Sequence, residues 1–387
     1  MPTSFRGSLA PAARLASFYF AYFAYVGAFV AYFPVYLAWK GLDAAEIALV
    51  LALPQLARVF APGLWGWLAD HWGAKKAGAQ RSIVIFSCAA MTFCFAALPY
   101  ASGMRTIGLL IAFASVLSAG ALPLVEAITL GSLAAEPGRY GPIRLWGSVS
   151  FMAVVLAGGV WLDFHSVATL PAALTLSALA CAGASLLLPR TAAPAPQQAR
   201  RFSIPPGAQA ILAAGFCMAL AHGALYAFFT LHLQREGYSG TMIGFLWTLG
   251  VIAEILVFAY LPALFRRYSL STILIASFLC AAVRFLAIGW ASSYLWILAA
   301  AQLLHAATFG SFHAASLAVV HRLFRPEAQA RGQALFSSVA YGAGGAAGAL
   351  LAGWAWQISG PALAFTLAAL AGLCGAYFAY VMKRAGL

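Results

Sequence analysis

The amino-acid sequence predicts an all-α integral membrane protein, and three observations support this fold class. Of the 387 residues, 64% are hydrophobic and only 8% are charged, whereas a soluble domain carries about 25% charged residues. The mean hydropathy is +0.90. The apolar residues also form runs of about 20, the length with which a helix crosses a hydrocarbon core of roughly 30 Å. Because so few charges cannot cover a surface that faces water, a soluble globular enzyme is excluded.

The chain contains twelve apolar segments separated by short polar stretches. Their approximate bounds are 15–39, 44–69, 82–100, 106–135, 143–162, 166–189, 208–233, 239–263, 271–290, 293–321, 332–356 and 361–382. Because an even number of crossings returns the chain to its starting side, we expect both termini on one side of the membrane.

The basic residues indicate which side this is. Sixteen Lys and Arg residues lie on the side shared with the termini, three lie on the opposite side, and three lie within apolar segments. Lys and Arg gather in cytoplasmic loops. We therefore expect a multi-pass protein of the cell's inner (plasma) membrane with both termini in the cytoplasm. The formal net charge of +13 then reflects topology, and no nucleic-acid partner is expected.

A polar stretch divides the segments into six and six. It spans 190–206 and is rich in Pro and Arg, a composition that predicts a cytoplasmic linker. We therefore expect an N-terminal six-helix bundle at 1–189 and a C-terminal six-helix bundle at 207–387.

The two halves contain an internal repeat. Residues 33–59 align without gaps on 229–255 at an offset of 196, which pairs Gly41 with Gly237. At the same offset Arg58 falls on Glu254, so one charge-bearing position carries opposite signs in the two halves. A repeat at equivalent segments predicts two parallel, pseudo-symmetric bundles.

A glycine-rich basic motif, GWLADHWGAKK at 66–76, follows the second segment. Its spacing resembles the G-x-x-x-D-x-x-G-x-[RK]-[RK] signature of the major facilitator superfamily. The resemblance implies a conformational latch between the halves, formed by Gly66, Asp70, Gly73 and Lys75. An ordinary basic loop is the alternative. The equivalent loop of the second half, 265–268, lacks the aspartate, so the latch is expected on one side only.

Several ionisable residues lie within the apolar segments. A charge at the centre of a membrane helix costs about 2.5–3.5 kcal/mol on insertion scales, and such residues persist where they face a partner or a water-filled cavity. For any single residue, the alternative to a functional role is an ion pair that only holds two helices together. A lone histidine in a membrane helix often only forms a hydrogen bond to a neighbouring helix. The set consists of Arg58, Glu126, Arg144, Glu254 and Arg284, together with His222, His305 and His313.

A more specific resemblance begins at the fourth and fifth segments. Leu124-Val-Glu126-Ala, followed by Tyr140-Gly-Pro-Ile-Arg144-Leu-Trp-Gly147, is similar to the lactose permease group, in which the matching glutamate and arginine bind substrate. The phenylpropionate permease branch is closer, because it shares YG-x-x-RLWGS, GFLWTLGVIAE at 244–254, LFRR at 264–267 and the pair at 304–305. This similarity covers most of the chain. It implies a major facilitator fold of twelve transmembrane helices in two six-helix pseudo-symmetric bundles, working by alternating access.

Two positions depart from the lactose permease. In the tenth segment that permease has a glutamate one helical turn after its histidine, and here this position is Thr308. In the eighth segment its glutamate would fall at Val251, whereas the carboxylate of this chain lies one turn later, at Glu254. A disaccharide substrate is therefore doubtful. A carboxyl group in a medium of low dielectric constant binds its proton more tightly than in water, and a nearby arginine reverses this effect. We expect Glu254 to carry a coupled proton, with Arg144 or Arg284 as modulators and His305 or His313 as relays.

An aromatic stripe runs along the first segment. Its members are Phe18, Tyr22, Tyr25, Phe29, Tyr32 and Tyr36, which share one face of a helix. Such stripes often only pack. Because buried phenols need hydrogen-bond partners, the stripe also suits a cavity wall for a flat, partly apolar substrate, and Tyr25 and Tyr32 are candidate contacts.

These observations predict a secondary active transporter and not an enzyme. We expect proton-coupled uptake of a small organic acid; the resemblance implies an aromatic carboxylate such as 3-phenylpropionate. Its carboxylate would bind Arg144 first or Arg58 second, and the resemblance implies Glu126 as a further substrate-binding residue. A proton-coupled sugar or nucleoside symporter and a drug-efflux antiporter are the alternatives. No cofactor or metal is expected, because the six cysteines form no CxxC pair. We expect a monomer in lipid, with the substrate and protons as partners.

Overall fold

The computed structural model describes residues 9–73, 78–190 and 203–386. Within these ranges the chain forms helices and turns and no strand, which confirms the all-α class. The physical reason is the solvent: in hydrocarbon every backbone N–H and C=O must be bonded within the protein, and a helix does this locally. Most of the expected linker at 190–206 falls outside the described residues.

The first half contains six long helices and three short 3-10 turns. These are α1 (Leu9–Trp39), α2 (Ala44–Gly73), α3 (Ala79–Ala97), η1 (Leu98–Tyr100), α4 (Gly103–Ser132), η2 (Pro137–Arg139), α5 (Tyr140–Phe164), η3 (Val167–Thr169) and α6 (Leu170–Ser185).

The second half is less regular, because two of its membrane segments contain π-helical stretches, η4 and η6. Its elements are α7 (Ala208–Arg235), α8 (Gly240–Arg267), α9 (Leu270–Trp290), α10 (Leu295–Leu303), η4 (Ala306–Ser311), α11 (Phe312–Leu323), η5 (Pro326–Ala328), α12 (Gln329–Ser337), η6 (Ser338–Gly344) and α13 (Gly345–Arg384).

Eleven helical segments of the described ranges are long and apolar enough to cross a membrane. The last of them, Gln329–Arg384, has 56 residues, about 84 Å at 1.5 Å per residue. It is interrupted at Gly360, whose φ of 72° and ψ of −160° separate two helices. The break lies in the predicted interval between the apolar segments 332–356 and 361–382. The whole helical segment is long enough for two crossings. The number of twelve transmembrane helices stays a prediction, and the length of this last segment agrees with it.

The internal repeat is visible in the helix bounds. In the first half α1 ends at Trp39 and α2 begins at Ala44; at an offset of 196 residues α7 ends at Arg235 and α8 begins at Gly240. The predicted alignment of 33–59 on 229–255 therefore matches two pairs of structurally equivalent helices.

The turns within this repeat are also equivalent. Gly41 and Gly237 have φ values of 84° and 85°, a left-handed conformation that glycine adopts without steric cost. The same offset places Arg58 in α2 and Glu254 in α8 at matching positions of the two halves.

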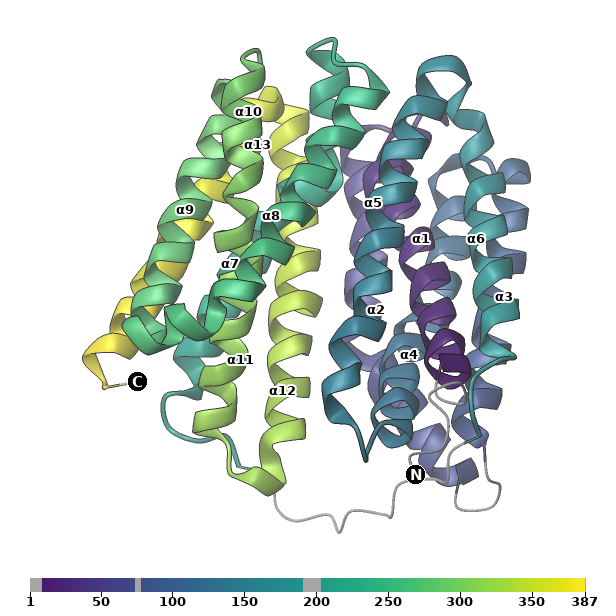
Figure 1. Cartoon of the computed structure of the whole chain (residues 1–387). Coiled ribbons are helices and arrows are strands. Elements are labelled where there is room, and N and C mark those ends of the chain that lie inside the picture. Colours follow the sequence, from purple (N-terminus) through teal and green to yellow (C-terminus); the bar gives the residue numbers. More distant parts are fainter. Residues whose placement is uncertain (1–8, 74–77, 191–202, 387) are drawn as a thin grey trace.

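Figure 1 shows the two halves side by side, α1–α6 in purple to teal and α7–α13 in green to yellow. The first residue of α1 and the last of α13 lie toward the same side, which we call the terminal side; the opposite side is the far side. Helices α1 and α7 are the most enclosed, with 72% and 67% of their apolar windows buried.

On the far side the halves are joined closely where α5 faces α8. Gly159 lies against Gly240, and a Cβ on either residue would overlap the backbone of the other. The carboxylate of Asp163 accepts hydrogen bonds from the backbone N–H of Gly240 (2.5 Å) and of Thr241 (2.9 Å), and from the Thr241 hydroxyl (2.5 Å). A carboxylate of one half therefore caps a helix N-terminus of the other half.

Candidate substrate and proton site

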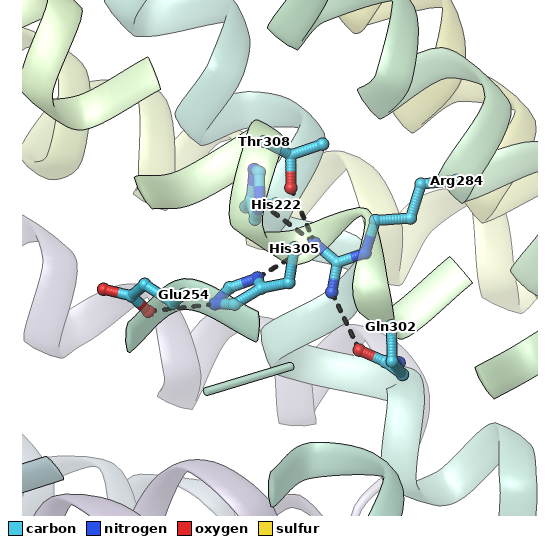
Figure 2. Close-up of polar contacts among 6 residues, drawn as sticks. All are labelled: His222, Glu254, Arg284, Gln302, His305 and Thr308. Carbon is cyan, nitrogen blue, oxygen red and sulfur yellow. Dashed lines mark hydrogen bonds and ion pairs between the residues drawn. The ribbon is translucent and has the colours of Figure 1, made fainter. Parts of the chain in front are cut away.

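Arg284 of α9 is the centre of a buried hydrogen-bond network (Figure 2). Its side chain is 1% exposed. The guanidinium donates to Oγ1 of Thr308 and to Oε1 of Gln302, both at 2.9 Å. Nη1 also lies 3.1 Å from Nδ1 of His305 and 3.5 Å from Nε2 of His222. Within the described ranges no carboxylate contacts Arg284, so neutral side chains alone surround this charge.

These contacts determine where the two histidines carry their protons. A guanidinium group has donors and no acceptor, so Nδ1 of His305 must accept from Arg284. The proton of neutral His305 is then on Nε2. Nδ1 of His222 lies 2.9 Å from the carbonyl oxygen of Met218, to which it must donate, and this leaves Nε2 of His222 to accept from Arg284.

Glu254 of α8 contacts this network from the side opposite Arg284. Its Oε2 lies 3.5 Å from Nε2 of His305, and the two side chains are 19% and 11% exposed. Figure 2 shows His305 between the carboxylate and the guanidinium group. Glu254 also interacts electrostatically with His313 and with Arg144 of the other half. The structure thus groups Glu254, His305 and Arg284, as expected, while their role in proton coupling stays a prediction.

Two glycines allow Glu254 to approach the helix that carries His305. A Cβ at Gly310 would lie 2.8 Å from Cγ1 of Val257 and 3.3 Å from Cγ of Glu254. A Cβ at Gly250, one turn before Glu254, would lie 3.4 Å from Cβ of His305. Gly310 belongs to the π-helix η4, a kind of irregularity that recurs at functional sites. Small residues and the π-helix together place carboxylate and imidazole in contact.

Arg58 of α2 lies between the two halves. Its side chain is exposed, and no described acidic residue pairs with it. Its partners within electrostatic range include four tyrosines, two from each half: Tyr22, Tyr25, Tyr226 and Tyr341. Because the partners come from both halves, Arg58 faces the region between them and not the surrounding lipid.

Arg144 of α5 lies on aromatic rings. Its guanidinium carbon is 4.0 Å from the ring centroid of Phe23 and 5.7 Å from that of Tyr19. Glu126 does not pair with it directly: the Glu126 carboxylate accepts from the Tyr140 hydroxyl at 3.5 Å and interacts with Arg144 at longer range. Within the described ranges Arg144, like Arg58, keeps its donors free of a carboxylate partner.

The two candidate tyrosines of α1 occupy different surroundings. Tyr25 is 8% exposed, interacts with Arg58 and has a side-chain hydrogen bond with Ser118. Tyr32 is 2% exposed, and its hydroxyl donates to the backbone carbonyl of Val155 in α5. Tyr32 therefore contributes to packing near the far side, and Tyr25 lies nearer the charges. Their contact with substrate stays a prediction.

His313 joins the two π-helical segments. Its Nδ1 lies 2.7 Å from the hydroxyl of Tyr341 in η6, and its ring stacks on Phe309 of η4 at 6.1 Å. Phe309 in turn stacks on His305 at 5.2 Å. The two histidines proposed as relays thus lie at opposite ends of one aromatic column.

The predicted latch is described only in part. Gly66 lies within α2, Asp70 belongs to its last turn, and Gly73 is its final residue. The side chain of Asp70 is not described, and Lys75 lies outside the described residues. The latch role of these four positions therefore stays a prediction. In the described part of the chain, no three His, Cys, Asp or Glu residues form a group that could hold a metal ion.

The predicted site residues do not include Gln302, Tyr226, Tyr341 or Asp163. One signal for Gln302 was available: Gln302, His305 and Thr308 are spaced by three in an otherwise apolar stretch, and residues three apart are neighbours on a helix surface. The other contacts join segments far apart in the chain. Asp163 and Thr241, for example, are 78 residues apart, and nothing local in the sequence links them.

Comparison with known proteins gives consistent matches. A model of the MFS_1 like family matches residues 12–367. The probable 3-phenylpropionic acid transporter of Escherichia coli (strain K12) is 30% identical over 371 residues, 92% of this chain and 94% of that protein. The maltose permease of Geobacillus stearothermophilus is 29% identical over 375 residues, 94% of this chain and 93% of that protein.

Solved structures show the same fold at lower identity. The nucleoside transporter NupG has a TM-score of 0.79 at 18% identity, over 96% of this chain and 99% of that chain. A bacterial homologue of the human lysosomal transporter Spinster, in an inward-facing and unoccupied conformation, has a TM-score of 0.70 at 12% identity, over 99% of this chain and 98% of that chain.

Proposed function

The chain belongs to the MFS_1 like family and is a multi-pass membrane transporter of the major facilitator type, and from this premise we propose that it takes up a small aromatic carboxylate together with protons. One observation carries the proposal: Arg58 and Arg144 lie near the junction of the halves without a carboxylate partner among the described residues, and both have aromatic neighbours. Transport would proceed by alternating access between the two six-helix bundles, with the termini in the cytoplasm.

The chemistry of these arginines favours an acid over a neutral solute. A guanidinium group binds a carboxylate through two parallel, charge-assisted hydrogen bonds. The rings near these arginines, Phe23 in contact with Arg144 and Tyr25 within electrostatic range of Arg58, suit the flat apolar part of the same molecule. A neutral sugar would supply no counter-charge to either guanidinium group, whereas an acid would.

Glu254 and His305 are the proposed proton carriers. Arginine does not release its proton near neutral pH, whereas carboxyl and imidazole groups do. His305 can take a second proton only on Nδ1, the atom that now accepts from Arg284. Protonation of His305 would therefore require Arg284 to move away, and this would link proton binding to a shift between α9 and the α10–η4 helix.

A sugar symporter is the second candidate, because a maltose permease matches the chain at nearly the same identity as the phenylpropionic acid transporter. The nucleoside transporter, at 18% identity, shares the fold alone. Ligand binding separates these classes directly, because a ligand of the folded state raises the melting temperature.

The first test is a thermal-shift screen on purified protein with 3-phenylpropionate, related aromatic acids, maltose and nucleosides. We expect the aromatic acids alone to raise Tm, and Arg144→Gln to remove the shift. Arg105→Gln is the matched control, because Arg105 begins α4 on the far side, away from these groups. A shift with maltose and none with the acids would replace the proposal by a sugar symporter.

The second test measures transport in proteoliposomes. Because the undissociated acid crosses a bilayer unaided, protein-dependent uptake is the difference between wild-type and Arg144→Gln vesicles. We expect labelled acid to accumulate when the interior is made alkaline, and to leave when the gradient is reversed. Binding without any protein-dependent response to the pH gradient would retain the substrate class and reject proton coupling.

A further inference from the structure

A groove on the surface of the first half has no part in the proposed transport site. It has a volume of about 670 Å³ and is bounded by the first turns of α1, by Trp146 of α5 and by the end of α6. Five of its ten lining residues are alanine, and the large apolar ones are Phe20, Trp146 and Leu187. A pocket of this volume lies within the usual range for ligands of drug size.

The groove faces away from the region between the halves. Trp146 is two residues from Arg144, so the two side chains point about 200° apart on α5. Arg144 contacts Phe23 and Tyr19, whereas the Trp146 side chain is 51% exposed. An exposed indole on the outer face of a membrane helix contacts lipid.

The position of the groove along the helices places it in one leaflet. On α1 it extends from Ala13 to Ala21, a rise of about 12 Å, and α1 begins only four residues earlier, at Leu9. On the other wall Gly183 and Leu187 are at the end of α6. The groove therefore opens to the leaflet on the terminal side.

Two arginines lie near the terminal-side end of the groove without being lining residues. Arg14 lies between the lining residues Ala13 and Ser17 and is exposed. Nη2 of Arg81 donates to the carbonyl of Leu186, next to the lining residue Leu187, at 2.5 Å. Nε of Arg81 is buried and has no hydrogen-bond partner in the described part of the chain.

Two further residues complete the charge pattern. Arg190 is exposed and lies three residues beyond Leu187. Glu136, an acidic residue at the terminal side of the same half, pairs with Arg139 at 3.0 Å and does not neutralise these arginines. The end of the groove is therefore a positively charged rim beside an apolar channel.

We propose that this groove binds one anionic phospholipid of the terminal-side leaflet, with an acyl chain along α1 and α6 and the phosphate at Arg14 and Arg81. An apolar groove alone cannot select a lipid, because lipid tails are as apolar as its walls. Selection must come from the headgroup, and basic pockets between membrane helices on the cytoplasmic side recognise anionic headgroups. The bound lipid would pack against the outer faces of the helices that carry Tyr25 and Arg144.

The test is lipid retention by the full chain, measured by native mass spectrometry after incubation with equal amounts of phosphatidylglycerol and phosphatidylcholine. We expect one retained phosphatidylglycerol per wild-type protein. Arg14→Gln should weaken its binding about five-fold, the contribution of one arginine near an anionic surface. Gly183→Leu should abolish it, since a Cβ at Gly183 meets open space and a leucine there fills the groove without a clash.

Matched controls separate the groove from general effects. Gly131→Leu also adds a side chain at an open glycine of the first half, and Arg105→Gln removes an arginine from its far side; both should retain lipid as wild type does. Equal retention of the two lipids by the wild type, or wild-type retention by Gly183→Leu, would overturn the proposal. The proposal would also be overturned if the wild type retained no lipid and a variant lacking residues 2–8 retained it, because the chain itself would then be the occupant of the groove.

Discussion

The two halves of the molecule use the same helix position for opposite purposes. Arg58 in α2 is exposed and has no ion-pair partner among the described residues. Its repeat mate Glu254 in α8 is mostly buried and contacts His305, which leads to the fully buried Arg284. The first half therefore offers unpaired positive charge, and the second half encloses a carboxylate, an imidazole and a guanidinium group in one network.

This difference suggests how one fold could divide substrate and proton handling. An unpaired arginine binds an incoming carboxylate without first breaking an ion pair, so the first half suits the substrate. A network of a carboxylate with neutral histidines changes its hydrogen bonds when one proton is added, so the second half suits the coupled ion. The electrostatic interaction between Arg144 and Glu254 connects the two regions across the junction of the halves.

The largest effect is expected from neutralising the substrate arginine. Arg144→Gln should weaken binding of the aromatic acid at least about thirty-fold, because removing one partner of a hydrogen-bonded charge pair costs about 2–5 kcal/mol. Arg144→Lys should retain weak binding, since lysine supplies charge without the planar fork. Isothermal titration measures both. If Arg144→Gln binds like wild type, Arg144 is structural and Arg58 becomes the first candidate.

Glu254→Gln tests the second half in a different way, because glutamine mimics a permanently protonated carboxyl group. We expect this variant to bind the acid within a few-fold of wild type and to exchange labelled for unlabelled substrate, but to lose accumulation driven by a proton gradient. Counterflow and gradient-driven uptake in the same vesicles give the two readouts. Accumulation at the wild-type level would move the coupling role to Glu126.

Gly310→Ala should disturb coupling without removing any ionisable group. The added Cβ would lie 2.8 Å from Cγ1 of Val257 and 3.3 Å from Cγ of Glu254, so these side chains must shift beside His305. We expect gradient-driven uptake to fall about ten-fold with little change in substrate affinity. Gly131→Ala, at a glycine with open space around it, is the control; equal activity of the two variants would show that the Glu254–His305 contact is dispensable.

The smallest effect concerns the far side. Asp163→Asn weakens the cap that α5 supplies to α8, and loss of a helix cap costs about 1 kcal/mol, so closed and open populations should shift about five-fold. A cysteine introduced at Gln357, which lines a cavity between the halves at the far side, should then react faster with a water-soluble maleimide. Glu236→Gln is the control, since Glu236 bonds Ser293 within one half, and its reactivity should not change.

Much of the fold was predictable from local patterns in the sequence. Apolar runs of about 20 residues predicted the crossing helices, because hydrocarbon leaves the backbone no other partner. The offset of 196 predicted the equivalence of α2 and α8, and the interval before 361 contains the break at Gly360. These features depend on composition and spacing along the chain, which the printed sequence contains in full.

The ionisable residues of the candidate site could be identified from the sequence, but their geometry and neutral partners such as Gln302 and Tyr341 could not. Charges in apolar segments identify Arg58, Arg144, Glu254 and Arg284 because membrane burial of charge is costly. Helix bounds cannot show that Arg284 is surrounded by Gln302, Thr308 and two histidines, or that Glu126 and Arg144 remain unpaired.

What the sequence determined by itself was the fold class, the segment bounds, the repeat and the small set of ionisable residues within the helices, because each is a local consequence of the membrane as a solvent. The tertiary structure alone decided which of these residues touch. Their contacts depend on the rotation and close approach of helices that are distant in the chain: the π-helix and glycines that bring Glu254 to His305, and the α5–α8 crossing that places Asp163 on Thr241. Such approaches depend on the packing of whole helices, and no short stretch of sequence encodes them.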